Sequence, residues 1–186
     1  VNDTEVSKLK GKELRKFRRH VGMIFQSYNL VPRVTVLKNV MFARVPDMSL
    51  FKVIFGLFSK EDKLVALDSL NKVGILDKAY IRADQLSGGQ QQRVSLARAL
   101  SQESEILLAD EPVSALDPVT AKEVMDDFKR INEEFNKTIL LNIHHVELAL
   151  EYASRIIAVK KGKIVYDGPS QEVTKEILDE VYRKEA

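Results

Sequence analysis

The stretch from Gln85 to Pro118 constrains the fold of this chain more than any other, because it holds three patterned segments in a fixed order. The first, LSGGQ at residues 86–90, places a hydroxyl and two glycines directly before a helical pattern with an apolar side. The first backbone N–H groups of a helix lack partners within the helix and lie at the positive end of its dipole. Such a helix start suits the binding of a phosphate.

The other two segments follow within thirty residues. A short apolar run, ILLA at residues 106–109, ends in Asp110 and Glu111, and its composition predicts a strand buried on both faces. Carboxylates at the C-terminal end of such a strand lie where α/β sheets bind ligands. The third segment, SALDP at residues 114–118, is a polar turn with proline at the expected start of a helix. Each segment alone has an ordinary structural explanation, but their order and spacing together argue against a purely structural one.

These segments resemble the signature, Walker B and D-loop motifs of the ATP-binding cassette (ABC) ATPases. The resemblance implies an α/β fold, namely a P-loop NTPase (RecA-like) core that is incomplete at its N-terminus, with a helical subdomain that carries the signature motif. It divides the chain into a core remnant over residues 1–26 and a helical subdomain over 27–101. The core then continues over 102–186 with Walker B, the D-loop, the switch histidine and a C-terminal hairpin and helix.

The resemblance also implies catalytic and metal-binding roles in the hydrolysis of ATP with Mg²⁺. Asp110 would hold the ion, and Glu111 would orient and deprotonate the attacking water. Gln26, which follows a predicted strand over residues 21–25, would reach both the metal and the water, since an amide can donate and accept at once. A glutamine in this position is otherwise structurally neutral.

His144 would complete the sensor of the γ-phosphate, because a neutral imidazole at the end of a strand can hydrogen-bond a phosphate or water. A histidine after a strand is more often structural. The following VELALEYASRI, however, matches the family pattern and selects His144 over His145.

Residues that would bind the nucleotide held by a second copy are those of the signature, Ser87, Gly88, Gly89 and Gln90. Asp117 would contact the site of that copy across the interface. The active unit would therefore be a head-to-tail homodimer that drives an integral membrane permease subunit and is served indirectly by a substrate-binding protein. Its place would be cytoplasmic and peripheral, on the inner face of the cell membrane. Features such as RADQLSGGQQQR and the ending DGPSQEVTKEILDEVY are most similar to ATPase subunits of importers for phosphonate or a related phosphorus oxyanion.

The phosphate-cradling pattern G-x-x-x-x-G-K-[ST] does not occur in the 186 residues. With the family resemblance, this predicts a truncated family member that does not hydrolyse ATP by itself. A sheet edge and apolar faces left uncovered would offer a route to association. Two other functions stay open, a soluble ABC ATPase outside transport and a non-catalytic remnant that acts as a binding piece.

Composition narrows the partners. Net charge is +2, from 29 basic and 27 acidic residues, and the basic N-terminal stretch has Phe17 as its single aromatic residue. We therefore expect no nucleic-acid partner, and we expect a short surface helix over residues 12–19. The chain has no cysteine and no apolar run near the ~20 residues of a membrane helix, so any role at a membrane would depend on a partner.

An unusually apolar segment, MSLFKVIFGLF at residues 48–58, places Phe51, Phe55 and Phe58 at helical spacing. We expect these side chains to pack in the core of the helical subdomain. The alternative, implied by the family resemblance, is a docking site for a helix of the membrane subunit. Directly afterwards, Ser59 and Asp62 fit a capping box that opens a helix over residues 60–73.

Overall fold

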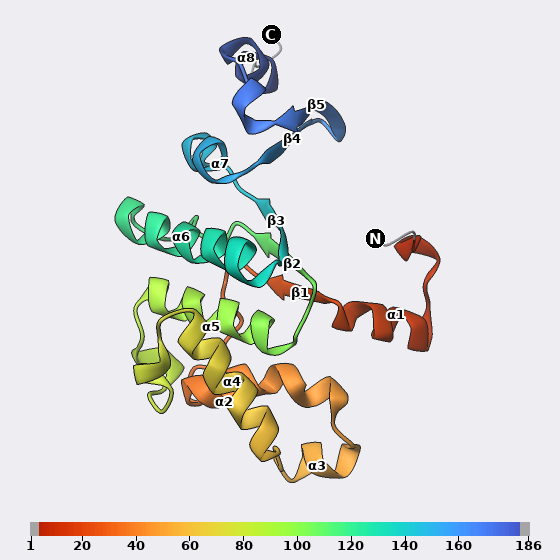
Figure 1. The fold of residues 1–186 in the computed structure, drawn as a ribbon, viewed down its shortest axis with the longest axis vertical. Helices are drawn as coiled ribbons and strands as arrows, with labels where there is room; N and C mark the ends of the chain where they lie inside the picture. The colour runs from red at the N-terminus through yellow and green to blue at the C-terminus, as the bar shows by residue number, and fades with distance from the viewer. Residues whose placement is uncertain (1–3, 183–186) are drawn as a thin grey trace. The chain divides into compact units, whose positions relative to one another are not determined.

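The computed structural model describes residues 4–182, and the chain divides into two compact units between Asn142 and Ile143. Figure 1 shows the order of the elements within each unit. The first unit contains the parallel sheet and most of the helices. The second unit contains a β-hairpin with one helix before it and one after it.

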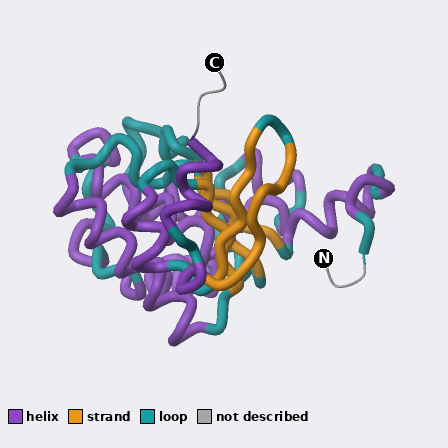
Figure 2. Tube along the Cα trace, turned by 90° about the horizontal axis from the view of Figure 1, so that it is seen from above, coloured by secondary structure: helices purple, strands orange, loops and turns teal. Residues whose placement is uncertain are grey.

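Figure 2 draws all strands in orange, those of the hairpin in the second unit included. A parallel sheet of three strands lies in the first unit. Its strands, in spatial order, are β1 (Val21–Ile24), β2 (Ile106–Asp110) and β3 (Thr138–Asn142). Ile24 lies opposite Ala109, and Asp110 lies opposite Asn142. Parallel strands require long crossover connections. The connection between β1 and β2 contains the helical part of the unit, whereas the next contains only α6 (Pro118–Phe135). The C-terminal ends of all three strands therefore meet at one edge of the sheet.

Only one face of this sheet is covered by helices within the described residues. Gly22, Leu107 and Ala109 are buried on the face that packs against α5 (Gly88–Ser101) and α6. A Cβ atom on Gly22 would lie 2.7 Å from Ser104 Oγ, so glycine permits this close approach.

The opposite face of the sheet is open, which corrects one expectation from the sequence. Met23, Leu108 and Leu140 lie in register across it, and Leu140 is 57% exposed. The strand that carries ILLA was expected to be buried on both faces. That expectation is wrong for the described residues, because the helices that cross between the strands lie on one side only.

The helical part of the first unit packs around its own apolar core. Its helices are α2 (Val36–Met41), α3 (Leu50–Ile54), α4 (Lys60–Lys72) and α5. Val40, Leu70 and Val94 are fully buried where α2, α4 and α5 meet. The predicted capping box is confirmed, since Ser59 Oγ accepts a hydrogen bond from the Asp62 N–H at 3.0 Å and Asp62 Oδ2 accepts one from the Ser59 N–H. These local signals fix where the helix begins.

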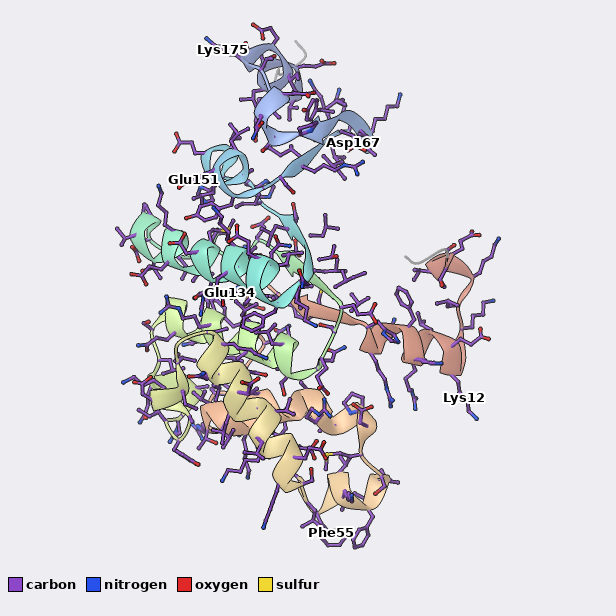
Figure 3. The ribbon with its side chains drawn as sticks, in the orientation of Figure 1. Lys12, Phe55, Glu134, Glu151, Asp167 and Lys175 are labelled. Carbon is purple, nitrogen blue, oxygen red and sulfur yellow. The ribbon has the colours of Figure 1, made fainter. Side chains whose placement is uncertain are left out.

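The Phe-rich segment does not pack as expected. Phe51 and Phe55 are 64% and 62% exposed, and their rings contact each other with centroids 4.6 Å apart. Phe55 lies at the outer end of this part of the chain (Figure 3). The expectation of a core position is therefore wrong for these two residues, because α3 spans only five residues and Gly56, at φ +62°, follows soon after its end. The docking alternative stays a prediction.

Several shorter elements complete the first unit. A helix, α1 (Gly11–Arg19), precedes β1 as predicted, and it contains no buried residue. The 3₁₀ segments are Val6–Lys8, Phe42–Asp47, Leu76–Lys78 and Ala83–Gln85. None of the helices in residues 4–182 combines the length and the apolarity that crossing a bilayer would require.

The second unit is built on an antiparallel hairpin, as predicted. Its elements are α7 (Val146–Tyr152), β4 (Arg155–Lys160), β5 (Lys163–Pro169), a 3₁₀ turn (Ser170–Glu172) and α8 (Lys175–Tyr182). Lys161 and Gly162, both at positive φ, form the two-residue turn that suits the twist of a hairpin. The Arg155 guanidinium makes two hydrogen bonds with the Asp167 carboxylate, at 2.7 and 2.9 Å.

Candidate functional site

Two adjacent carboxylates stand where β2 ends. Asp110 is the last residue of the strand, and its Oδ1 accepts a hydrogen bond from Asn142 Nδ2 on β3 at 2.8 Å. Glu111 follows at φ +47°, a left-handed conformation that is uncommon for residues other than glycine. Its N–H donates to the Asn142 carbonyl at 2.9 Å. The backbone thus turns sharply at the edge of the sheet, directly between the two acidic side chains.

Gln26 connects the end of β1 to the second of these carboxylates. Its Nε2 donates to Glu111 Oε2 at 3.0 Å and to Ser114 Oγ at 3.1 Å. Ser114 Oγ in turn donates to the Glu111 carbonyl at 3.1 Å. The structure therefore brings together Gln26 and Glu111, as the sequence predicts. It adds Ser114, which sequence reasoning placed only in a turn.

The signature residues begin α5 with a second capping box. Ser87 is exposed, its Oγ accepts from the Gln90 N–H at 3.4 Å, and Gln90 Oε1 accepts from the Ser87 N–H at 3.1 Å. Gly88 and Gly89 also allow α5 to pack closely against α6 and the turn before it. A Cβ atom on Gly89 would lie 2.3 Å from Thr120 Cγ2 of α6, so a larger residue would push the helices apart. The sequence indicated the helix start but not this close contact.

Asp117 caps α6, a role that sequence reasoning did not assign. Its Oδ1 accepts hydrogen bonds from the N–H groups of Val119 and Thr120, both at 3.1 Å, and Pro118 occupies the first helical position. The hydrogen bond from the Thr120 side chain, followed by the backbone bonds, holds the pKa of the Asp117 carboxyl below its usual value. An aspartate directly before a proline that opens a helix is the signal that could have revealed the cap.

His144 belongs to the second unit, between β3 and α7, and its side chain is exposed. Gln26, Asp110 and Glu111 all belong to the first unit. The role of His144 as a phosphate sensor therefore stays a prediction from the sequence.

The donor set at the sheet edge fits a magnesium ion that arrives with a nucleotide. No group of three or more His, Cys, Asp or Glu side chains that could hold a metal occurs in the described part of the chain. Mg²⁺, however, is commonly bound through one or two carboxylates together with the phosphates of a substrate. Asp110 supplies such a carboxylate at the end of β2, and Gln26 adds an amide oxygen, so the residues present fit the ion.

A parallel sheet with two carboxylates and an amide at its C-terminal edge, together with an exposed, serine-capped helix start, defines an ATPase domain of the ATP-binding cassette class. The chain belongs to the ABC transporter family, whose sequence pattern matches residues 1–114.

Two curated relatives of the chain have the same name. The Phosphonates import ATP-binding protein PhnC of Lactococcus lactis subsp. cremoris (strain SK11) is 97% identical over 185 residues, which cover 100% of this chain and 75% of the relative. The protein of the same name from Staphylococcus aureus (strain bovine RF122 / ET3-1) is 55% identical over 182 residues, covering 98% of this chain and 71% of that relative.

Solved structures agree with the predicted fold. A dimeric ATP-binding cassette in a post-hydrolysis state, bound to ADP and Pi, matches with a TM-score of 0.72 and 36% identity over 91% of this chain and 72% of that chain. A putative metal-chelate type ABC transporter in an inward-facing conformation matches with a TM-score of 0.80 at 24% identity, which shows the fold alone. That match covers 88% of this chain and 63% of the other. The predicted family and the α/β ABC ATPase fold are confirmed.

Proposed function

We propose that the chain is the ATP-hydrolysing subunit that powers an importer for phosphonates or a related phosphorus oxyanion. Membership of the ABC transporter family and the name shared by the curated relatives support this function. The observation that carries the hydrolytic part is the hydrogen bond from Gln26 Nε2 to Glu111 Oε2, because it places an amide and a carboxylate together at the edge of the sheet.

The chemistry is the transfer of a phosphoryl group to water. When bound, ATP supplies this group, and Mg²⁺ supplies positive charge that offsets the charge on the phosphate oxygens. Asp110, whose Oδ1 accepts a hydrogen bond from Asn142, would provide an oxygen ligand to the ion. Glu111 accepts a proton from the attacking water, and Gln26 keeps the carboxylate oriented for that step. A positioned general base of this kind contributes roughly 10²–10⁴-fold to a rate.

The signature helix serves the nucleotide of a second copy. Ser87 is exposed at the start of α5, where backbone N–H groups and the helix dipole favour a phosphate. We therefore place Ser87, Gly88, Gly89 and Gln90 against the γ-phosphate held by a partner subunit. Asp117 lies across the same interface, and His144 completes the phosphate sensor of its own subunit. The unit that hydrolyses ATP is then a homodimer.

A permease subunit docks on the helical part of the chain. A groove of about 450 Å³ lies there, and its lining includes Leu37, Met41 and Phe58. The exposed rings of Phe51 and Phe55 belong to the segment directly before Phe58. An apolar groove beside exposed aromatic side chains suits an apolar helix of a partner. The subunit then lies at the inner face of the membrane, and the transported ligand meets the permease and its binding protein instead of this chain.

The test is an ATPase assay on the subunit extended to include the phosphate-cradling pattern G-x-x-x-x-G-K-[ST], which these 186 residues lack, and purified with its membrane permease in lipid vesicles. Hydrolysis that rises when a phosphonate-loaded binding protein is added supports the proposal. The import function is contradicted if the rate of ATP hydrolysis does not change when the loaded binding protein is added. It is also contradicted if the subunit does not co-purify with any permease. The expectation that the 186 residues do not hydrolyse ATP by themselves stays a prediction.

A further inference from the structure

One arginine ties the loop after Gln26 to the signature helix. Arg98 of α5 donates from Nη2 to the Tyr28 carbonyl at 2.8 Å and from Nη1 to the Asn29 carbonyl at 2.5 Å. It has no carboxylate partner among the described residues. Burial lowers the pKa of the Arg98 guanidinium, so the group has lost part of its hydration without gaining an ion pair. The hydrogen bonds from Arg98 to the two loop carbonyls compensate for the lost hydration.

The two carbonyls that Arg98 binds belong to residues in an uncommon conformation. Tyr28 and Asn29 lie at φ +59° and +50°, consecutively in the left-handed region. Asparagine enters this region fairly often, but tyrosine seldom does. Local hydrogen bonds, such as those from the Tyr28 N–H to the Phe25 carbonyl and from the Asn29 N–H to the Ser27 carbonyl, bend the loop. Arg98 is the side chain from outside the loop that holds both peptide groups.

Tyr28 also reaches the start of the signature helix. Its hydroxyl lies 3.2 Å from the place where a Cβ atom on Gly88 would be. Gly88 and Arg98 are ten positions apart on α5, which corresponds to about 15 Å along a helix. Tyr28 therefore contacts α5 at two places, with its carbonyl at Arg98 and its hydroxyl beside Gly88.

Both ends of the loop are fixed as well. Gln26 is bound to Glu111 at the entrance, as described above. At the exit, Asn39 of α2 accepts from the Val31 N–H at 2.7 Å and donates to the Val31 carbonyl at 3.1 Å, and it is only 1% exposed. Arg98 thus holds the middle of a short loop whose first residue lies beside the proposed catalytic carboxylate.

We propose that Arg98 is a positioning residue. It makes the loop over residues 26–31 and the signature helix α5 move as one unit. Displacement of α5 by the nucleotide of a second copy then shifts Tyr28 and, two residues before it, Gln26 beside Glu111. Arginine suits this role because its planar guanidinium presents two donors to two neighbouring carbonyls, whereas lysine presents a point charge on a flexible stem. The functional consequence rests on the proposed ATPase function, but the mechanical link does not.

Hydrogen–deuterium exchange on the 186-residue chain tests the link directly. Arg98→Met removes the donors and keeps much of the bulk, and we expect exchange at the Tyr28 and Asn29 amides to rise about tenfold or more. The matched control is Arg93→Met on the same helix, where the arginine pairs instead with Asp127 of α6 at 2.7 Å. The control should leave the loop amides unchanged. An unchanged loop in Arg98→Met, or an equal rise in both variants, overturns the proposal.

Arg98→Lys keeps the test decisive if Arg98→Met does not fold. Lysine keeps the positive charge but lacks the paired donors of the guanidinium. We therefore expect faster exchange at the Tyr28 and Asn29 amides, while the melting temperature of the variant equals that of the parent chain. Loop exchange equal to that of the parent chain overturns the proposal. Because exchange is read without nucleotide, its result is separate from the ATPase result. If hydrolysis proves independent of Glu111 while Arg98→Lys loosens the loop, the proposed function fails and the link stands.

Discussion

Side chains at the edge of the sheet hold one another through hydrogen bonds that cross between strands. Asp110 is bound from β3 by Asn142, and Glu111 is bound from the loop after β1 by Gln26. The left-handed conformation of Glu111 costs of order 1–3 kcal/mol unless the surroundings compensate for it. Backbone strain of this kind concentrates at functional sites, and the bonds from Asn142 and Gln26 provide that compensation.

The acid sensitivity of the α6 cap follows from the lowered pKa of Asp117. A carboxyl whose pKa is lower in the folded chain contributes stability that is fully present above its unfolded value, about 3.9, and is lost as the pH falls through the folded value. Asp117→Asn keeps a good capping side chain but cannot titrate. We therefore expect the variant to lose less stability than the parent chain below about pH 4.

The measurement is urea unfolding of both chains between pH 3 and pH 7. Asp77→Asn serves as the control, since Asp77 is an exposed aspartate that pairs with its neighbour Lys78. Parallel loss of stability in the parent chain and in Asp117→Asn over the acid range contradicts the assignment of the cap.

Two helices of the first unit begin with the same device, and only one of them lies at the proposed site. Ser87 opens α5 and Ser59 opens α4, each with a complete capping box. Replacing either serine with alanine should cost about 0.5–2 kcal/mol of unfolding free energy. Only Ser87→Ala should also lower the ATPase rate of the assembled subunit, because only that helix faces the nucleotide of a second copy.

The pair of variants therefore separates a structural role from a functional one. Chemical denaturation gives the stability loss, and a steady-state assay gives the rate. Equal ATPase rates for Ser87→Ala and Ser59→Ala would remove the signature serine from the proposed site.

Local signals in the sequence predict these elements well, and non-local ones do not. The capping box at Ser59 and the turn at Gly162 depend on residues within a few positions, so their patterns can be recognised in the chain itself. The exposure of Phe51 depends on which other elements cover α3, and no local pattern records that. The exposure of Leu140 depends in the same way on which elements cover the sheet.

The site could be predicted to a similar extent. Motif spacing placed Gln26, Glu111 and Ser87 correctly at strand and helix ends. Capping residues and turn residues within a few positions mark such ends in the sequence. The contact of Arg98 with the Tyr28 carbonyl joins residues seventy positions apart and leaves no pattern around either of them. The packing of Gly89 against Thr120 is hidden for the same reason.

At the scale of the whole molecule, the open face of the sheet should govern association. Met23 and Leu140 lie in line across it, and exposed apolar strands favour contact between copies. We expect Leu140→Lys to shift the 186-residue chain toward the monomer in light scattering. The control, Ile164→Lys, changes an exposed residue of β5 in the second unit and should leave association unchanged. A parent chain that is already monomeric at high concentration contradicts this expectation.

The central claim is that Glu111 accepts the proton of the water that attacks ATP. The most direct test compares Glu111→Gln with Glu105→Gln in a subunit that includes the phosphate-cradling pattern G-x-x-x-x-G-K-[ST] and is assembled with its permease. Glu105 is an exposed carboxylate just before β2, at the opposite end of the same strand, beside His20. We predict that Glu111→Gln lowers the rate of ATP hydrolysis at least about 100-fold while ATP still binds, and that Glu105→Gln hydrolyses ATP like the parent. A Glu111→Gln variant that hydrolyses ATP at the parent rate would contradict the claim.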